Sequence, residues 1–325
     1  MDPARTSHRQ PRRLPVSIGV WIGVALVPVL ALVVRPDPIE TTDPGDPAEP
    51  VAYAVPNVDL ATNTARFVSE CGHSHSANND PILFPGQPGE SHFHDFFGNT
   101  GTDADSTHAT LAEGTTTCQG AADLTAYWAP ALFQHGEHVE PLGVHAYYRV
   151  APGTDPESVR AFPEGLMMIA GDATASSPQP TEVVAWSCDR SPVVSAAPQQ
   201  CPKGAPLSLR VTFPDCWRGG GEANLDSADH RSHVAYGGGE GCPPSHPVAI
   251  PQLTLAVRYP IYGPIEGLSL APGSLLQGHA DFFNAWDPAK LENEIGSCLQ
   301  RGVVCVIPGS TGHHAAFAED LKDQL

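Results

Sequence analysis

The chain has 325 residues, 41% of them hydrophobic, which is enough to bury the core of one large domain or two small ones. Gly (31) and Pro (34) are abundant, a composition that favours turns and short strands over long helices. The net charge is −19, and because five of the 17 cations lie in the first 35 positions, the rest of the chain carries 12 cations against 35 acids. Such a surface repels phosphate backbones, which argues against nucleic acid as a partner. It suits divalent cations or neutral glycans, although solubility alone also explains it.

The N-terminus has the features of a membrane anchor. Residues 1–13 are basic, and residues 14–34 form an uncharged stretch of 21 residues, LPVSIGVWIGVALVPVLALVV. That length can cross a bilayer as a helix, and the arginines before it place the N-terminus in the cytoplasm. We expect a single-pass transmembrane signal-anchor in the cell membrane, with the rest of the chain extracytoplasmic. A cleaved signal peptide and a secreted protein are the alternative.

After this stretch the chain divides by composition into three parts. Residues 35–56 are rich in Pro and acidic residues and have little to bury, so we expect an extended linker. Residues 57–308 contain the short apolar runs of one folded extracytoplasmic domain, and residues 309–325 form a C-terminal tail.

Cysteine usage also indicates an exported domain. All eight Cys follow the apolar stretch, and no two of them form a C-x-x-C pair. An even number of Cys in an exported chain indicates disulfide bonds rather than zinc clusters. Pairing of neighbours closes short loops and predicts Cys188–Cys201, Cys216–Cys242 and Cys298–Cys305, which leaves Cys71 for Cys118. Other pairings remain open at this point, because eight Cys allow about 105 of them.

The apolar runs predict a mainly β domain, a sandwich or jelly-roll-like single domain with long loops. The runs are short, rich in β-branched and aromatic residues, and bounded by Pro, Gly and Asp. The predicted strands are 125–133, 144–150, 165–170, 183–188, 207–213, 232–236 and 252–259. One short C-terminal helix is predicted after Asp287, which can cap the first turn while Pro288 takes the first helical position.

Three polar motifs contain histidine close to aspartate. They are SHFHDFFGN at 91–99, LDSADHRSHVAY at 225–236 and HADFFNAWD at 279–287. In an extended segment residues two apart share a face, which groups His92 with His94 and His279 with Asp281. In a helical turn residues three or four apart share a face, which groups His233 with His230 or with Asp229.

Imidazole and carboxylate groups gathered in this way suit a divalent transition metal such as zinc, copper, iron or manganese, or a general acid–base set. The alternative is that the same side chains only hydrogen-bond the loops of a Pro- and Gly-rich fold. The predicted metal ligands are His92, His94, His230, His233 and His279. The predicted catalytic residues are Asp95, Asp229, Asp281, His94 and His230.

Long ordered motifs also resemble a known family. The run DPILFPGQPGESHFHDFFGN at 80–99, FPDCW at 213–217, LDSADHRSHVAY at 225–236, CPPSHPVAIP at 242–251 and HADFFNAWD at 279–287 are similar to the DUF1996 family, and the resemblance covers about residues 67–300. It implies an exported protein of a kind found in bacteria and fungi, sometimes beside carbohydrate-binding modules, and it names no reaction.

Two functions therefore stand side by side as expectations. One is an extracellular hydrolase of cell-wall or environmental polysaccharide, in which a metal-bound water is the nucleophile. The other is a non-catalytic surface module that binds a glycan or a metal. Both take a divalent transition metal as the possible cofactor and a polysaccharide as the possible partner.

Overall fold

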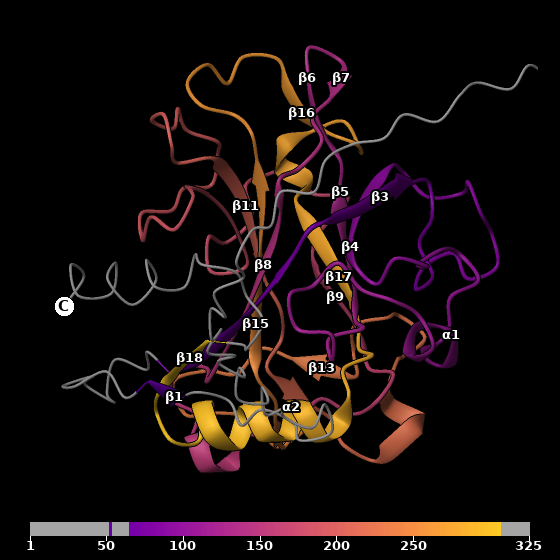
Figure 1. The fold of residues 1–325 in the computed structure, drawn as a ribbon, viewed down its shortest axis with the longest axis vertical. Helices are drawn as coiled ribbons and strands as arrows, with labels where there is room; N and C mark the ends of the chain where they lie inside the picture. The colour runs from indigo at the N-terminus through magenta and orange to yellow at the C-terminus, as the bar shows by residue number, and fades with distance from the viewer. Residues whose placement is uncertain (1–51, 54–64, 307–325) are drawn as a thin grey trace, which may run out of the picture. The chain divides into compact units, whose positions relative to one another are not determined.

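A computed structural model describes residues 52–53 and 65–306 (Figure 1). The predicted transmembrane segment 14–34, the tail 309–325 and all of the linker 35–56 except Ala52 and Tyr53 lie outside the described residues. Within the described residues, the helices are too short or too polar to serve as a membrane span.

Two large sheets dominate the described chain. Neighbouring strands pair antiparallel in both sheets, except that β18 and β2 run parallel. The seven-stranded sheet has the order β1 (Ala52–Tyr53), β18 (Val304–Val306), β2 (Arg66–Cys71), β8 (Gly143–Arg149), β15 (Gln252–Tyr259), β11 (Leu207–Thr212) and β10 (Val184–Cys188). The five-stranded sheet has the order β3 (His73–Ala77), β4 (His94–Gly98), β5 (Ala126–Pro130), β17 (His279–Phe283) and β9 (Met167–Gly171).

Smaller elements complete the described fold. Two three-stranded sheets are formed by β13 (Val234–Ala235), β12 (Cys216–Trp217) and β14 (Val248–Ala249), and by β16 (Leu268–Leu270), β6 (Leu132–Gln134) and β7 (Glu137–His138). The helices are α1 (His108–Ala112) and α2 (Pro288–Glu294), which η5 (Ile295–Leu299) continues, with 3-10 turns at η2 (Pro156–Ser158), η3 (Gly221–Asn224) and η4 (Leu275–Gln277). The predicted mainly β class and the short C-terminal helix are confirmed, and Asp287 caps α2 by accepting a hydrogen bond from the Lys290 amide.

The two large sheets share one hydrophobic core. Because alternate residues of a strand face opposite sides, each sheet contributes every second side chain to this core. Phe67 of β2 stacks on Tyr148 of β8 with ring centroids 4.6 Å apart, and Phe282 of β17 lies 5.9 Å from Tyr127 of β5. The main core therefore lies between the sheets, as in a sandwich.

The outer face of the five-stranded sheet carries a second, smaller core. Phe96, Trp128, Ile169 and Phe283 project from this face and are covered by Ile82 and by Leu111 of α1. The sheet is thus buried on both sides, which explains why β4, β5 and β17 have no exposed residue. The paired phenylalanines of the first and third motifs divide between the two cores: Phe97 and Phe282 face the main core, and Phe96 and Phe283 face the smaller one.

Four disulfide bonds cross-link the described chain, and their pairing is the predicted one. They join Cys71 to Cys118, Cys188 to Cys201, Cys216 to Cys242 and Cys298 to Cys305. Two strand predictions were too long. The predicted strand 125–133 is divided at Ala131 into β5 and β6, which belong to different sheets. Of the predicted strand 232–236 only Val234 and Ala235 form β13, because residues 226–233 turn back on themselves around the Asp229 carboxylate.

Candidate metal site

Two histidines from distant parts of the chain meet on the outer face of the five-stranded sheet. His94 of β4 lies opposite Pro130 of β5. Asp281 of β17 lies opposite Trp128 of β5, so continuing that register by two residues brings His279 to the other side of Pro130. Because the proline side chain is short and compact, the two imidazole rings reach over it toward each other, with centroids 5.7 Å apart.

His92 completes the group from the loop that precedes β4. Its ring centroid lies 4.1 Å from that of His94 and 4.9 Å from that of His279. The Nε2 atoms of His92 and His279 are 3.0 Å apart, and one ring nitrogen from each of the three histidines lies within 4.8 Å of those of the others. This set, His92, His94 and His279, is called the histidine triad below.

Hydrogen bonds fix the orientation of two of the three rings. The Nδ1–H of His94 donates to the Asn79 carbonyl at 3.0 Å, and the Nδ1–H of His279 donates to the Gln277 carbonyl at 2.8 Å. A carbonyl oxygen can only accept, so both rings must carry their proton on Nδ1 when they are neutral, which leaves Nε2 as a lone pair. Metal-ligating histidines commonly have this arrangement, with the outer nitrogen bonded to a backbone carbonyl.

The surroundings keep the triad neutral. Burial lowers the pKa of His92 to about 4 and that of His279 to about 3. Burial, followed by the neighbouring His92 and His279 rings, holds the pKa of His94 well below its ordinary value. Near neutral pH the rings are therefore uncharged imidazoles, the form that binds a metal.

Direct hydrogen bonding accounts for only part of this geometry. If His92 carries its proton on Nε2, it donates to the lone pair of His279 and the 3.0 Å contact is an ordinary hydrogen bond. The Nε2 atom of His94 is buried and has no hydrogen-bond partner among the described residues. A metal at the centre of the triad would supply a partner for all three nitrogens.

Two more buried polar groups lack partners on the same face. Both carboxylate oxygens of Asp281 and the indole nitrogen of Trp128 are buried without a hydrogen bond within the described residues, and these two residues lie opposite each other in β17 and β5. Burial, and then the charge of Asp80, raise the pKa of Asp281 well above its ordinary value, against a lowering by Arg231. Unpartnered buried polar groups are rare in folded proteins, so Asp281 and Trp128 leave unmet hydrogen-bonding capacity beside the packed residues of this face.

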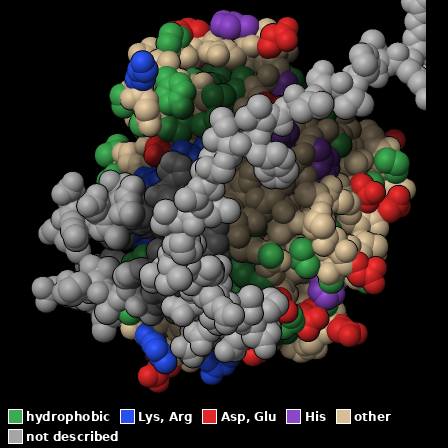
Figure 2. All heavy atoms as spheres, in the orientation of Figure 1, with side chains coloured by type: hydrophobic (Ala, Val, Ile, Leu, Met, Phe, Trp, Pro, Cys, Tyr) green, Lys and Arg blue, Asp and Glu red, His purple; other side chains and the backbone are tan. Residues whose placement is uncertain are grey.

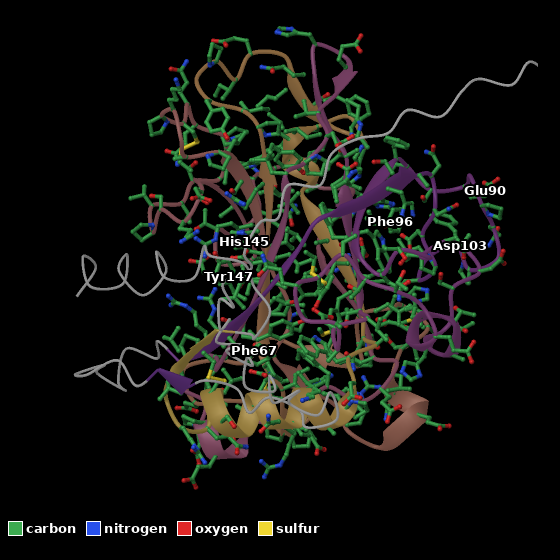
Figure 3. The ribbon with its side chains drawn as sticks, in the orientation of Figure 1. Phe67, Glu90, Phe96, Asp103, His145 and Tyr147 are labelled. Carbon is green, nitrogen blue, oxygen red and sulfur yellow. A yellow bond between two sulfur atoms is a disulfide. The ribbon has the colours of Figure 1, made fainter. Side chains whose placement is uncertain are left out.

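A groove opens at the other end of the same face. Its volume is about 730 Å³, and Pro81, Pro163, Met167, Leu225 and Phe283 are among its lining residues. Phe283 is four residues from His279 on β17, a distance of about 13 Å along a strand. Figure 3 labels Phe96 on β4 and Glu90 in the loop that precedes β4 and contains His92.

Asp95 does not reach the triad. It follows His94 in the strand and therefore points to the opposite side, where its Oδ1 accepts hydrogen bonds from Ser76 at 2.6 Å and from His138 at 2.9 Å. Burial raises its pKa, and these two bonds lower it. The structure assigns Asp95 to the packing of β3, β4 and β7.

The three predicted residues of the second motif also stay apart from the triad. His230 bonds the Asp226 carboxylate at 2.8 Å. His233 uses both ring nitrogens, one with Ser227 at 2.9 Å and one donating to the Met167 carbonyl at 2.6 Å. Asp229 is exposed and accepts bonds from Ser227 and from the Arg231 and Ser232 amides, which hold its pKa well below its ordinary value. The structure thus gives His230 and His233 separate partners, and neither belongs to a candidate metal group among the described residues.

The remaining candidate metal groups of the described chain each contain two cysteines. These are Cys71 with Cys118 and Asp123, Cys216 with Cys242 and Asp215, and Cys298 with Cys305 and Glu294. All six cysteines are in disulfide bonds and have no thiolate to offer. The histidine triad is the group whose donors remain available.

Two neighbours of the triad were missed by the reasoning from sequence. Asp80 belongs to the loop that covers the face, and its Oδ1 accepts hydrogen bonds from the Ile82 and Leu83 amides. In the sequence it stands between Asn79 and Pro81, a pattern that indicates a turn rather than a functional site. Arg231 donates to the Gly171 carbonyl at 2.9 Å and so pins the second motif to the edge strand β9. Arg231 lies inside the second motif, between His230 and His233, and was not predicted as a site residue.

The comparisons with known proteins agree with the motifs. The chain matches the family described as Domain of unknown function (DUF1996) over residues 80–286, a stretch that includes the triad and Asp281. Neither the curated proteins nor the solved structures include a match to the chain. Because the family match covers more than half of its length, the chain belongs to the DUF1996 family.

Proposed function

We propose that this protein works outside the cell and that its histidine triad binds one divalent transition metal, which assists hydrolysis of an extracellular polysaccharide. The four disulfide bonds support an extracellular location, because such bonds persist in oxidising compartments. Residues 14–34 would hold the protein on the cell membrane as a signal-anchor, or would be removed from a secreted form.

The observation that carries the proposal is the orientation of the rings. His94 and His279 are locked by Nδ1–H bonds to backbone carbonyls, and their free Nε2 atoms face the same point as His92. Tetrahedral zinc with Zn–N bonds of about 2.0–2.1 Å places its ligand nitrogens roughly 3.3 Å apart, so small ring movements would complete the site.

Three histidines and an open fourth position are typical of catalytic rather than structural zinc. A zinc ion held by His92, His94 and His279 would lower the pKa of a water in its fourth position to about 7 and so make a nucleophile available at neutral pH. Asp281, on the same face and two residues from His279, would take up or return a proton. The groove, whose wall at Phe283 lies about 13 Å along β17 from His279, would hold a part of the glycan chain distant from the metal.

Metal titration of the purified full chain tests the proposal. Isothermal titration with Zn²⁺ should show one site per chain, and His94→Ala or His279→Ala should weaken it at least about 100-fold because each removes one of three ligands. His230→Ala is the matched control, since His230 bonds the Asp226 carboxylate and lies outside the triad, and it should bind as the wild type does. Equal affinity in all four proteins would remove the basis of the proposal.

The second candidate is a non-catalytic metal-binding module, and one observation favours it. His94 and His279 are almost fully buried, and a side-chain movement that brought Asp281, two residues from His279 on the same face, to the metal would close the site. Asp281→Asn separates the two functions. A closed structural site loses affinity in this variant as it does in His94→Ala, whereas an open site keeps its affinity and loses only release of sugars from polysaccharide substrates.

A further inference from the structure

The groove at Phe283, on the outer face of the five-stranded sheet, is a surface that solvent reaches. Its volume of about 730 Å³ lies within the range of roughly 300–1,000 Å³ that is usual for ligand pockets. Of its lining residues only Pro81, Gly165 and Phe283 are buried. The lining comes from β17 and from four segments that are distant in sequence, residues 80–90, 101–113, 163–167 and 221–231.

Three of these segments meet at Gly165 and give the groove an apolar lining. A Cβ on this glycine would lie 3.4 Å from the His108 Cβ at the start of α1 and 3.7 Å from a methyl group of Leu225 in the second motif. Pro85 and Pro163 add apolar surface. Because a proline side chain has no rotamer freedom to lose, covering these two residues with a ligand costs little conformational entropy.

The groove is strongly acidic. The four segments contain nine Asp and Glu but only one Lys or Arg, which gives a formal balance of −8. The one cation, Arg231, donates to the Gly171 carbonyl on β9. In Figure 2 acidic side chains predominate on the side of the molecule that carries α1 in Figure 1, whereas Lys and Arg lie on the opposite side. A ligand that carries positive charge is therefore complementary to the groove.

Two carboxylates of the lining are available to such a ligand. The side chain of Glu164 is 61% exposed, and its Oε2 lies 3.9 Å from the His108 Nε2. Glu222 is exposed in the first turn of η3. Within the described residues neither carboxylate lies within ion-pair distance of a lysine or an arginine. Each can therefore accept a charge-assisted hydrogen bond from an ammonium group.

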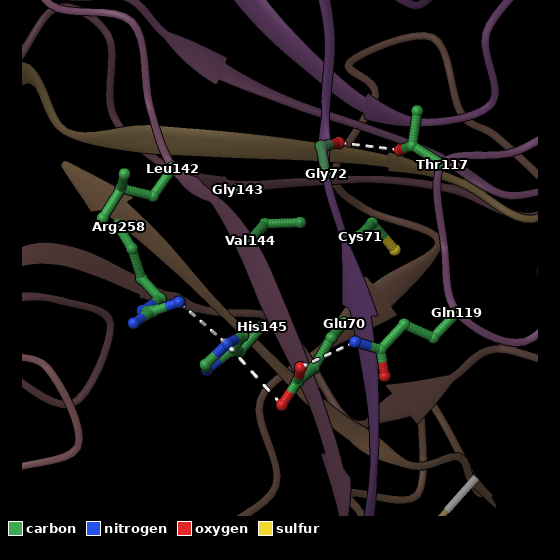
Figure 4. Close-up of a pocket in the computed structure, with 10 residues that line it drawn as sticks. All are labelled: Glu70, Cys71, Gly72, Thr117, Gln119, Leu142, Gly143, Val144, His145 and Arg258. Atoms are coloured by element: carbon green, nitrogen blue, oxygen red, sulfur yellow. Dashed lines mark hydrogen bonds and ion pairs between the residues drawn. The ribbon is translucent and has the colours of Figure 1, made fainter. Parts of the chain in front are cut away.

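A smaller pocket beside β2 and β8 does not have this character (Figure 4). Its volume is about 220 Å³, and its one carboxylate, on Glu70, accepts a hydrogen bond from Gln119 at 3.1 Å and lies 3.7 Å from His145. Arg258 adds a positive charge to the same wall. A cation would meet an acid that already has partners there, so the groove is the better site for a positively charged ligand.

The edge of the five-stranded sheet beside the groove is closed to a peptide strand. Met167 of the edge strand β9 donates its amide to the Leu225 carbonyl at 3.0 Å and accepts from His233 at 2.6 Å. Further along β9, the Gly171 carbonyl accepts from Arg231 at 2.9 Å. The second motif thus occupies the groups that a peptide would use to extend the sheet. A polysaccharide needs no such edge, because its ring faces and polar substituents bind side chains.

We propose that the groove binds a polysaccharide of amino sugars whose amines are free and protonated. The apolar faces of the rings would pack on Pro85, Pro163 and Leu225, and the amines would pair with Glu164 and Glu222. This inference rests on the proposed function for the choice of a polysaccharide, and it names the class of that substrate. Because Phe283 lies about 13 Å along β17 from His279, binding in the groove does not require the metal.

Isothermal titration of the metal-free full chain with a glucosamine hexasaccharide, in mildly acidic buffer, tests the inference. The wild type should bind it about tenfold more tightly than N-acetylglucosamine hexasaccharide, which has the same rings without the charges. Glu164→Gln and Glu222→Gln should each weaken binding about threefold, and the double variant about tenfold, because each removes one exposed ion pair. Glu157→Gln, at an exposed glutamate of η2 outside the groove, is the matched control and should bind as the wild type does.

The His94→Ala variant separates this inference from the proposed function. It lacks a ligand of the triad but keeps the groove, so it should bind glucosamine hexasaccharide as the wild type does, even where zinc binding is lost. The inference is overturned if the glucosamine hexasaccharide does not bind, if both hexasaccharides bind equally, or if the double variant binds no more weakly than Glu157→Gln. Tighter binding of a hexalysine peptide would also overturn it, because the groove would then favour a basic peptide.

Discussion

At the scale of single residues, burial sets the chemistry of the ionisable groups, and Glu294 of α2 shows it apart from any site. It lies inward on the helix with only 5% of its surface exposed, and burial raises its pKa to about 7. In the unfolded chain the carboxyl releases its proton near pH 4.5. The stability that the neutral form contributes is therefore complete below pH 4.5, falls as the pH rises to about 7, and is absent above that.

Replacing Glu294 with glutamine should remove this pH dependence. At pH 8 the variant should be more stable than the wild type by about 1 kcal/mol or more, a rise of roughly 2–4 °C in Tm, after allowance for solvent around the partly buried carboxyl. At pH 4 the two proteins should unfold together. Glu292→Gln is the control, because Glu292 lies two residues away on the exposed side of α2. Equal Tm differences at pH 4 and pH 8 would contradict the assigned burial of charge.

The residue scale also shows what sequence spacing could and could not predict about the site. Period-two alternation placed His92 with His94 and His279 with Asp281, and both pairs do lie on one side of the sheet. The same alternation sends Asp95 to the opposite side from His94, so spacing alone argues against Asp95 as a partner of His94. His230 and His233 are three residues apart, but the turn around Asp229 gives each of them its own partner.

At the scale of elements, the site depends on how closely β17 and β9 approach each other. Gly171 ends β9 opposite His279 and has a φ of +80°, a conformation that other residues rarely adopt. A Cβ at this position would lie 2.5 Å from the Gly278 carbonyl oxygen and 2.8 Å from the His279 Cα. Glycine is therefore required for β17 to hold His279 where it is.

Gly171→Ala should destabilise the protein by roughly 1–3 kcal/mol and weaken metal binding, because relief of the clash moves His279. The change is measured by denaturant unfolding and by Zn²⁺ titration of the variant. Gly136→Ala serves as the control for backbone strain alone, since that glycine also has positive φ but has no atom near its Cβ position. A Gly171 variant that binds zinc as tightly as the wild type would show that this contact does not position the triad.

Strand existence was the more predictable part of the elements, and strand order was the less predictable part. Runs such as 252–259 alternate strictly and became β15 with the expected bounds. β4 and β17 carry His and Asp and did not resemble strands until their partners were known. Of their buried polar side chains, His94, His279 and Asp281 lie on the face of the triad, whereas Asp95 bonds Ser76 and His138 on the other side. No local pattern indicates that Pro130, far from both in sequence, separates His94 from His279.

At the scale of the whole molecule, the disulfide bonds set how strongly distant parts are tied. Cys71–Cys118 spans 47 residues and joins β2 to the segment before β5, whereas Cys298–Cys305 spans seven residues at the C-terminal helix. Loop-closure entropy gives roughly 4 kcal/mol for the longer loop and roughly 2.4 kcal/mol for the shorter one. The first bond therefore contributes more to the stability of the sandwich.

Removing each pair by alanine substitution should follow that order. Cys71→Ala/Cys118→Ala should lower the free energy of unfolding by more than Cys298→Ala/Cys305→Ala does, by about 1–2 kcal/mol, in urea unfolding monitored by fluorescence. Both double variants remove buried cysteines, so the comparison isolates loop length to first order. The reverse order would mean that local strain or residual unfolded structure, rather than loop length, dominates.

Anomalous diffraction at the zinc absorption edge, from crystals grown with equimolar Zn²⁺, tests the metal proposal most directly. The account predicts one strong peak per chain, about 2.0–2.1 Å from a ring nitrogen of each of His92, His94 and His279, with His94 and His279 still bonded to Asn79 and Gln277. A map with no peak there and His92 still donating to His279, or with zinc bound at another place, would contradict it.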